Sequence, residues 1–205
     1  MKKNFRHIPT QRRSRSRVAS ILRSSEKIFS RVGYEAATTN AIADNAKIPI
    51  GSLYQYFRNK QAILRALAEQ YIAEYRDLFI RSIEANNAAK DHKTIMDYII
   101  DVTIEYYQEH PAFMVVFYGA ISENEFAKIS EEFLQELIKI GVDYYHRKCP
   151  NFDRQKLEVI ITVLIKSTRS IFPIAVRPDG SVDERYRTEL KRLATAYFRS
   201  ALEKV

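Results

Sequence analysis

Side chains suited to contacting a nucleic acid gather in one stretch of the sequence, TTNAIADNAKIPIGSLYQYFRNK, which runs from 38 to 60. An amide such as that of Gln55 can donate to and accept from an adenine edge, while hydroxyl and ammonium groups suit phosphate oxygens. Lys60 lies at a predicted helix N-terminus, where unpaired N–H groups already favour a phosphate. The residues that the stretch leaves free to face a partner are Ile50, Gly51, Ser52, Tyr54, Gln55 and Tyr56.

Two short helices and the start of a third must position these residues. Thr38 and Thr39 are capping-type residues that predict the start of the first helix. The apolar residues that follow recur at helical spacing and give this helix one buried face: Ile42, Ala43 and Ala46. Residues 47–49 then break it.

The second short helix begins at Pro49 and continues to about residue 57. Proline lacks a backbone N–H and is tolerated in the first turn of a helix. Leu53 and Phe57 are four residues apart and are predicted to point inward. Asn59 then caps a long third segment that starts with Lys60.

This stretch resembles the tetracycline-repressor (TetR) family of bacterial transcription regulators. Two residues depart from the family pattern: Lys47 stands where the family usually has a turn glycine, and Pro49 where a serine or similar cap is common. A lysine at 47 would carry strain if the turn needs a positive φ. The matching residues are Gly33, Tyr34, Thr38, Thr39, Ile42, Ala43, Ala46, Ile48, Gly51, Ser52, Leu53, Tyr54, Tyr56, Phe57, Asn59 and Lys60.

The resemblance implies how the stretch would bind DNA, with the second short helix in the major groove. The candidates for facing base edges are Ile50, Gly51, Ser52 and Gln55. The candidates for contacting phosphates are Thr39, Tyr54, Tyr56 and Lys60, and Thr38 belongs to the same predicted DNA-binding set. The alternatives are partial burial in the core for the two tyrosines and simple exposure for Ile50.

Positive charge is concentrated at the N-terminal end of the chain. Residues 1–31 hold ten basic residues and one acid, a net +9, and the whole 205-residue chain is +8, so the other 174 residues sum to −1. Beside the stretch described above, this excess favours contact with a polyanion, and a solvated tail is the alternative. Residues 1–14 are predicted to form a flexible basic arm, and Arg12, Arg13 and Arg15 could reach a minor groove or phosphates.

Apolar residues continue at helical spacing to the end of the chain, with no alternating strand pattern. The predicted fold class is all-α with about nine helices. We expect a three-helix helix-turn-helix module at residues 15–60 and a larger helical body at residues 61–205. The predicted helices span about 15–32, 38–46, 49–57, 59–84, 94–109, 112–118, 122–147, 153–172 and 183–202.

The resemblance further implies a homodimer and a small-molecule effector. In the family, the last two helices form the dimer interface, which suits the apolar run 157–165, although a core within one chain is the alternative. Effector binding in the larger domain would shift the helix 59–84 and release a repressor from a palindromic operator. Candidates for the pocket, each with ordinary core packing as its alternative, are Tyr71, Tyr106, Tyr107, Phe113, Phe117, Tyr118 and Phe133.

Two other functions are alternatives to a ligand-controlled regulator: a helical-bundle enzyme and a regulator controlled by a protein partner. Asp143 and His146 have a spacing seen in metal sites, and Glu105 with His110 makes a second pair, but a helical-bundle metal centre needs several converging ligands. We therefore expect no enzyme, no metal and no cofactor. A helix-turn-helix regulator controlled by a protein partner instead of a small ligand stays open.

Cysteine content and hydropathy indicate the cellular compartment in which the protein is expected. The single cysteine, Cys149, excludes a disulfide framework within the chain. No apolar run reaches the length of a membrane span, and the basic start is not followed by an apolar signal core. These patterns predict a cytoplasmic protein without a membrane partner.

Overall fold

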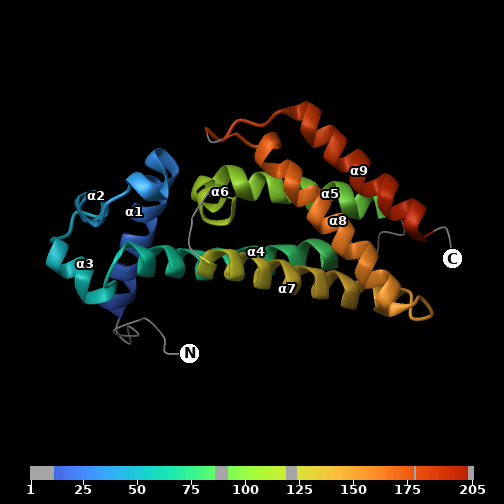
Figure 1. The fold of residues 1–205 in the computed structure, drawn as a ribbon, viewed down its shortest axis with the longest axis horizontal. Helices are drawn as coiled ribbons and strands as arrows, with labels where there is room; N and C mark the ends of the chain where they lie inside the picture. The colour runs from blue at the N-terminus through green and yellow to red at the C-terminus, as the bar shows by residue number, and fades with distance from the viewer. Residues whose placement is uncertain (1–11, 86–91, 119–123, 178, 203–205) are drawn as a thin grey trace. The chain divides into compact units, whose positions relative to one another are not determined.

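The computed structural model describes residues 12–85, 92–118, 124–177 and 179–202 (Figure 1). Within these ranges the chain forms nine α-helices, and extended backbone pairs only at an isolated antiparallel bridge between Val176 and Val182. The all-α prediction is therefore confirmed. No helix in the described ranges is long and apolar enough to cross a membrane.

The chain divides into two compact units, and each is built from two separate stretches of sequence. The first unit comprises Met1–Ile72 and His110–Phe126, and the second comprises Ala73–Glu109 and Ala127–Val205. Helix α4 (Lys60–Ala85) runs from the first unit into the second without a break. The expected boundary between a DNA-binding module and a helical body, between residues 60 and 61, stays a prediction.

Four helices and the start of α4 build the first unit: α1 (Arg12–Ala36), α2 (Thr39–Asn45), α3 (Ile50–Tyr56) and α6 (Pro111–Tyr118). Helix α1 packs against both α2 and α6, and α2 packs against α3 (Figure 1). The expected three-helix module thus has a further member, α6, which comes from much later in the sequence. The large fully buried side chains of this unit include Ile21, Phe29, Ile42, Leu53, Phe57, Ile63, Leu64, Leu67 and Tyr71.

Helix α1 is interrupted close to where the sequence predicts its end. Gly33 has φ 76° and ψ 171°, which is not helical, and residues 34–36 add one more turn beyond it. This region of φ is open to glycine because it has no Cβ. The helical spacing of apolar residues in the predicted helix 15–32 places Val32 on its buried face, but 43% of the surface of Val32 is exposed, so this prediction is wrong.

The second unit contains the later part of α4 with α5 (His92–Glu109), most of α7 (Asn124–Lys148), α8 (Arg154–Ala175) and α9 (Glu184–Leu202). Helix α9 packs against both α5 and α8 (Figure 1). A half-buried ion pair joins α9 to α5, since the ammonium of Lys191 lies 2.7 Å from the carboxylate of Asp101. Asp153 is a capping-type residue at the predicted start of the helix 153–172, and this prediction is confirmed, because its side chain accepts a hydrogen bond from the backbone N–H of Lys156 at 2.7 Å.

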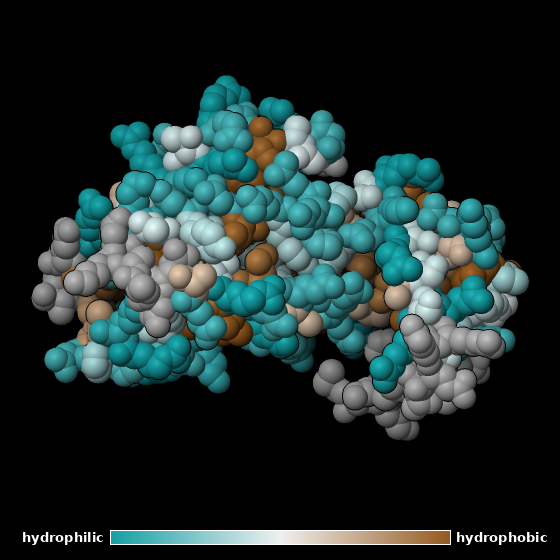
Figure 2. All heavy atoms as spheres, turned by 180° about the vertical axis from the view of Figure 1, so that it is seen from behind, coloured by the Kyte–Doolittle hydropathy of each residue, from teal (hydrophilic) through white to brown (hydrophobic). Residues whose placement is uncertain are grey.

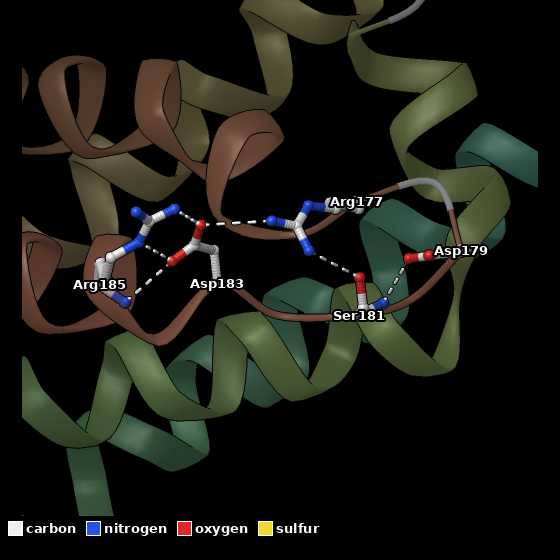
Figure 3. Close-up of polar contacts among 5 residues, drawn as sticks. All are labelled: Arg177, Asp179, Ser181, Asp183 and Arg185. Carbon is white, nitrogen blue, oxygen red and sulfur yellow. Dashed lines mark hydrogen bonds and ion pairs between the residues drawn. The ribbon is translucent and has the colours of Figure 1, made fainter.

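The connection between α8 and α9 is a tight turn held by its own polar groups (Figure 3). The carboxylate of Asp183 accepts hydrogen bonds from the guanidinium of Arg185 at 2.6 and 2.9 Å and from that of Arg177 at 3.3 Å. These bonds, the one from Arg185 first, lower the pKa of Asp183 to about 2. Asp179 accepts from the backbone N–H of Ser181 at 2.8 Å, which closes the turn.

Some sequence predictions fall on parts of the chain that lie outside the described residues. The sequence also predicts that Gly119 ends the short helix 112–118 and that Ser122 forms a capping box with Glu125 at the start of the next helix. Gly119, Ser122 and residues 1–11 of the basic arm lie outside the described residues, and the side chains of Arg12, Arg13 and Glu125 are not described. All of these stay predictions.

Hydrophobic residues reach the surface in places. Figure 2 shows one face of the molecule, largely hydrophilic (teal), with hydrophobic residues (brown) exposed between. Helices α8 and α9 contribute most of the large exposed apolar side chains among the described residues: Val159, Val163, Ile174, Tyr186 and Leu193.

Candidate nucleic-acid interface

Helix α2 begins at a capping threonine and ends in a tight turn. The hydroxyl of Thr38 accepts a hydrogen bond from the backbone N–H of Ala41 at 3.1 Å, so this side chain caps the helix. At the other end, the N–H of Ile48 donates to the carbonyl of Ala43 at 3.0 Å. Lys47, between these, has a φ of 55°, which confirms the strain expected at the position of the family's turn glycine.

Helix α3 separates a buried face from an exposed one within seven residues. Leu53 has no exposed surface, and Phe57, which ends the helix, is 1% exposed. Both predictions of inward-facing residues are therefore confirmed. On the other side, Gly51, Tyr54 and Gln55 are exposed, and Ile50, Ser52 and Tyr56 are half-buried.

A hydrogen bond fixes α3 to α2 at the surface. The hydroxyls of Thr39 and Tyr54 lie 3.0 Å apart, 15 residues from one another in the sequence. Because both belong to the predicted phosphate set, the bond holds two hydroxyls side by side on neighbouring helices. A phosphate that bound there would meet groups already in position.

Lys60 already has partners in the protein itself. Its ammonium donates to the carbonyls of Tyr34 at 2.6 Å and Glu35 at 3.0 Å, and it lies 4.3 Å from the centre of the Tyr34 ring. Asn59 caps the helix as predicted, since its side chain accepts from the N–H of Ala62 at 2.8 Å. In this arrangement Lys60 joins the start of α4 to the end of α1, so its phosphate role stays a prediction.

Exposed basic side chains lie along α1, the helix that packs on α2. In the described part of the chain, the exposed basic residues of this helix are Arg15, Arg17, Arg23, Lys27 and Arg31. Three of them recur every four residues and so share one side of the helix. This is the charge that the sequence assigns to a polyanion.

The aromatic residues predicted to line a pocket separate into two groups. In the first unit, the ring centres of Tyr71 and Phe113 are 5.6 Å apart, and those of Phe113 and Phe117 are 4.4 Å apart. These three are buried and Tyr118 is half-buried. Their packing matches the ordinary core alternative, and their role in a pocket stays a prediction.

In the first group a carboxylate ties three elements together. The hydroxyl of Tyr71 in α4 donates to Glu26 of α1 at 2.7 Å, and the ring nitrogen Nδ1 of His110, which precedes α6, lies 3.1 Å from the same oxygen. Burial alone would raise the pKa of Glu26, but these two hydrogen bonds and the nearby charges outweigh it, so the pKa lies below its ordinary value. Sequence reasoning missed this cluster, because only the fold brings its members together.

The second group surrounds Tyr75, which the helical spacing of apolar residues in the predicted helix 59–84 places on its buried face. The ring of Tyr75 lies 5.3 Å from that of Tyr106, 6.3 Å from that of Tyr107 and 5.7 Å from that of Phe133. The Tyr75 hydroxyl is 2.8 Å from that of Thr103. All these rings are buried in the second unit.

The two residue pairs considered for metal binding have other surroundings. Asp143 pairs with Arg154, and His110 with Glu26, as described above. His146 has a buried Nδ1 that meets no hydrogen-bond partner among the described residues. Within those same residues, no three histidine, cysteine or carboxylate side chains gather as metal ligands would.

Two family models match the chain. The model described as "Bacterial regulatory proteins, tetR family" matches residues 21–67, and the one described as "Tetracyclin repressor-like, C-terminal domain" matches residues 93–198. The second match alone covers more than half of the 205 residues. The chain belongs to the TetR family. The resemblance seen in the first third of the sequence is thereby confirmed, and TetR-family likeness extends into the second unit.

Two relatives of this TetR-family chain are described as transcriptional regulators of the helix-turn-helix (HTH) type. The uncharacterized HTH-type transcriptional regulator YvdT of Bacillus subtilis is 24% identical over 176 residues, which cover 83% of this chain and 89% of that protein. The uncharacterized regulator YerO of the same organism is 29% identical over 96 residues, 47% of this chain, and the match spans only 33% of that relative. A structure of the regulator FadR from Bacillus subtilis in complex with stearoyl-CoA has the same fold, with a TM-score of 0.64 and 17% identity over 91% of this chain and 98% of that one.

Proposed function

We propose that this TetR-family transcriptional regulator is a homodimeric repressor that binds a palindromic DNA operator and leaves it when a small molecule binds. One observation carries the DNA-binding part. Helix α3 is anchored by the fully buried Leu53 while Gly51, Tyr54 and Gln55 are exposed, which is the arrangement that a recognition helix needs.

The proposed DNA contacts are of two kinds: contacts to phosphates position the protein on the duplex, and contacts to base edges read the sequence. Thr39, Tyr54 and Tyr56 hold phosphates, and the bond between the first two hydroxyls supports this assignment. Gln55 faces an adenine edge, Ile50 a thymine methyl, and Gly51 and Ser52 allow close approach to the groove. Thr38 acts through α2, whose first turn it caps.

The dimer forms through α8 and α9. These helices expose Val159 to 62%, Val163 to 41% and Leu193 to 39%, and apolar side chains of this size are normally covered when they cluster. A dimer with twofold symmetry would present two α3 helices to half-sites about one duplex turn apart.

The effector binds among the aromatic residues of the helical body. The structural neighbour solved with stearoyl-CoA supports a ligand of this kind, and buried aromatic clusters suit an apolar or aromatic molecule. Long-chain acyl-CoA is therefore the first probe to use. The protein acts in the cytoplasm, where the operator lies, and has no catalytic role.

Selection of bound duplexes from a random DNA pool tests the proposal. A palindromic consensus with two half-sites, bound by one dimer, is the expected result. Stearoyl-CoA and a panel of aromatic and cationic compounds would then be added to the complex, and release of the operator by one of them is expected.

Weak, salt-sensitive binding with no consensus would contradict sequence-specific recognition, because phosphate contacts alone carry no sequence information. The selection could instead yield a consensus while no compound releases the operator or changes the melting temperature of the protein. That result would support DNA binding and contradict control by a small molecule.

A further inference from the structure

The turn between α2 and α3 contains a strained lysine. Among the residues that the structure describes, Lys47 is the one non-glycine residue with positive φ, at 55°, and the other two positive values belong to Gly33 and Gly180. In this region the Cβ of an L-residue crowds the backbone, which glycine avoids.

The turn needs this conformation at residue 47. The N–H of Lys47 donates to the carbonyl of Asp44 at 3.1 Å, and the next N–H, of Ile48, donates to Ala43 at 3.0 Å, so the chain reverses and α2 ends. Pro49 follows and α3 starts at once. Glycine would meet the same requirement without strain, which raises the question of what the lysine side chain contributes at this position.

Among the residues that the structure describes, the ammonium of Lys47 has no hydrogen-bond or ion-pair partner. Its side chain is exposed, and in the described part of the chain no carboxylate, carbonyl or ring pairs with it. Lys60 differs, because its ammonium already meets two carbonyls and the Tyr34 ring. Of these two lysines of the helix-turn-helix, the one at the turn has its charge available.

The general geometry of helix-turn-helix binding brings this turn close to the DNA backbone. In helix-turn-helix proteins the N-terminal residues of the recognition helix reach the base edges while the preceding helix crosses the backbone, so the turn between them meets the edge of the groove. We propose that Lys47 contacts a DNA phosphate from this turn, once in each protomer, and that this contact offsets the strain of its backbone. The inference rests on the proposed operator binding and adds a contact that the family's turn glycine cannot make.

Three substitutions at this residue separate charge from backbone. Lys47→Gln keeps a Cβ in the strained conformation but removes the charge, Lys47→Arg keeps both, and Lys47→Gly removes both. Lys139→Gln, at an exposed lysine of α7, is the matched control. Affinity for the selected operator is measured across salt concentrations, and melting temperature is measured alongside.

The Gln and Gly variants are expected to flatten the dependence of log affinity on log salt by about 0.9 per protomer. The ratio of wild-type to variant operator affinity would then fall by about 3.5-fold per protomer, or about 12-fold for a dimer, when salt is raised from about 50 to about 200 mM. The Arg variant and Lys139→Gln are expected to keep the wild-type slope. The Gly variant is expected to melt no lower than the wild type, because glycine relieves the strain.

Two outcomes would overturn the inference while operator binding by the wild type stands. One is an unchanged salt slope in Lys47→Gln. The other is a clearly lowered melting temperature in Lys47→Gly, which would mean that the lysine is retained for packing. A wild type that selects no operator would instead defeat the proposed function itself.

Discussion

At the scale of single residues, Glu26 is the point where three segments of the first unit meet. Its carboxylate receives the Tyr71 hydroxyl and lies beside His110, so α1, α4 and the start of α6 depend on one side chain. The side chain of Glu26 is only 23% exposed, which limits how far water can replace these partners. Charge on this carboxylate therefore contributes to stability.

We expect the pH dependence of unfolding to reveal this contribution. The pKa of Glu26 is lowered in the folded chain, so its stabilisation is fully present above the ordinary value of 4.5 and is lost as the pH falls through the folded-state pKa. Glu26→Gln should lower the free energy of unfolding by about 1 kcal/mol at neutral pH, because hydrogen bonds to a charged acceptor become neutral ones. Urea unfolding between neutral and acid pH measures both effects.

Glu69→Gln, at an exposed glutamate of α4 in the same unit, is the control for this measurement. The difference between wild type and Glu26→Gln should shrink on acidification, whereas the difference for the control should stay small throughout. A Glu26→Gln difference that is constant with pH would show that the carboxylate charge contributes nothing.

Residue types foretold some of these positions and not others. The strain at Lys47 was predictable, because a turn that normally takes glycine leaves any other residue at positive φ. The hydrogen bonds of Lys60 were not, since its carbonyl partners lie 25 and 26 residues away and become neighbours only when α1 packs. Burial of Val32 was predicted wrongly, because helical spacing marks a stripe without saying where its edge lies.

At the scale of elements, α3 combines a small buried anchor with the surface that we propose for DNA recognition. Seven residues are too few for a stable isolated helix, so packing by Leu53 and the flanking Phe57 must hold it in place. Gln55, two residues from the anchor, is exposed. The residues that hold α3 in place therefore differ from those that we propose for recognition.

Substitutions on the two faces of α3 should affect different properties: the buried face stability, and the exposed face DNA recognition. Leu53→Ala should cost about 2–5 kcal/mol of unfolding free energy, because it empties a fully buried site. Gln55→Ala should leave the melting temperature within a degree or so while changing the bases selected at one operator position. Thermal melting and duplex selection on both variants check this. Equal selected sequences for Gln55→Ala and the wild type would remove Gln55 from base recognition.

Helix ends were the most predictable feature at this scale. Thr38, Asn59 and Asp153 each accept a hydrogen bond from an N–H in the first turn of the helix that follows, as their residue types require. The partners of each helix were less accessible, because an apolar stripe does not name the surface that covers it. The packing of α6 on α1 joins residues about a hundred positions apart.

At the scale of the whole molecule, the proposed dimer places a requirement on the exposed face of α8. Val159→Glu with Val163→Glu should convert the dimer to a monomer at micromolar concentration, because two charges would be buried at the interface. Operator affinity should fall with it, since one protomer reads only one half-site. Size-exclusion chromatography with light scattering measures the oligomeric state.

Val32→Glu offers a matched control, because this valine of α1 in the first unit is also exposed, to 43%. It should leave the oligomeric state unchanged. If the wild type is monomeric, or if the doubly substituted α8 still dimerises, the interface must lie elsewhere or be absent.

The distribution of aromatic residues shows the limit of sequence reasoning at this scale. Tyr71 and Tyr75 are one helical turn apart in α4, yet the first packs with Phe113 in one unit and the second with Tyr106 in the other. Helical spacing predicts that both are buried. It does not predict that the division between the units falls between them.

The two-part composition of the first unit bears on how the chain is made. Translation releases α1 to α4 first, then α5 of the other unit, and only afterwards α6, which packs on α1. The DNA-binding unit therefore completes its core only after Tyr118 has left the ribosome. A fragment truncated at Ile72 would leave the α6-facing side of α1 bare and deprive Tyr71 of both His110 and Phe113. The unit can be isolated only together with its later segment.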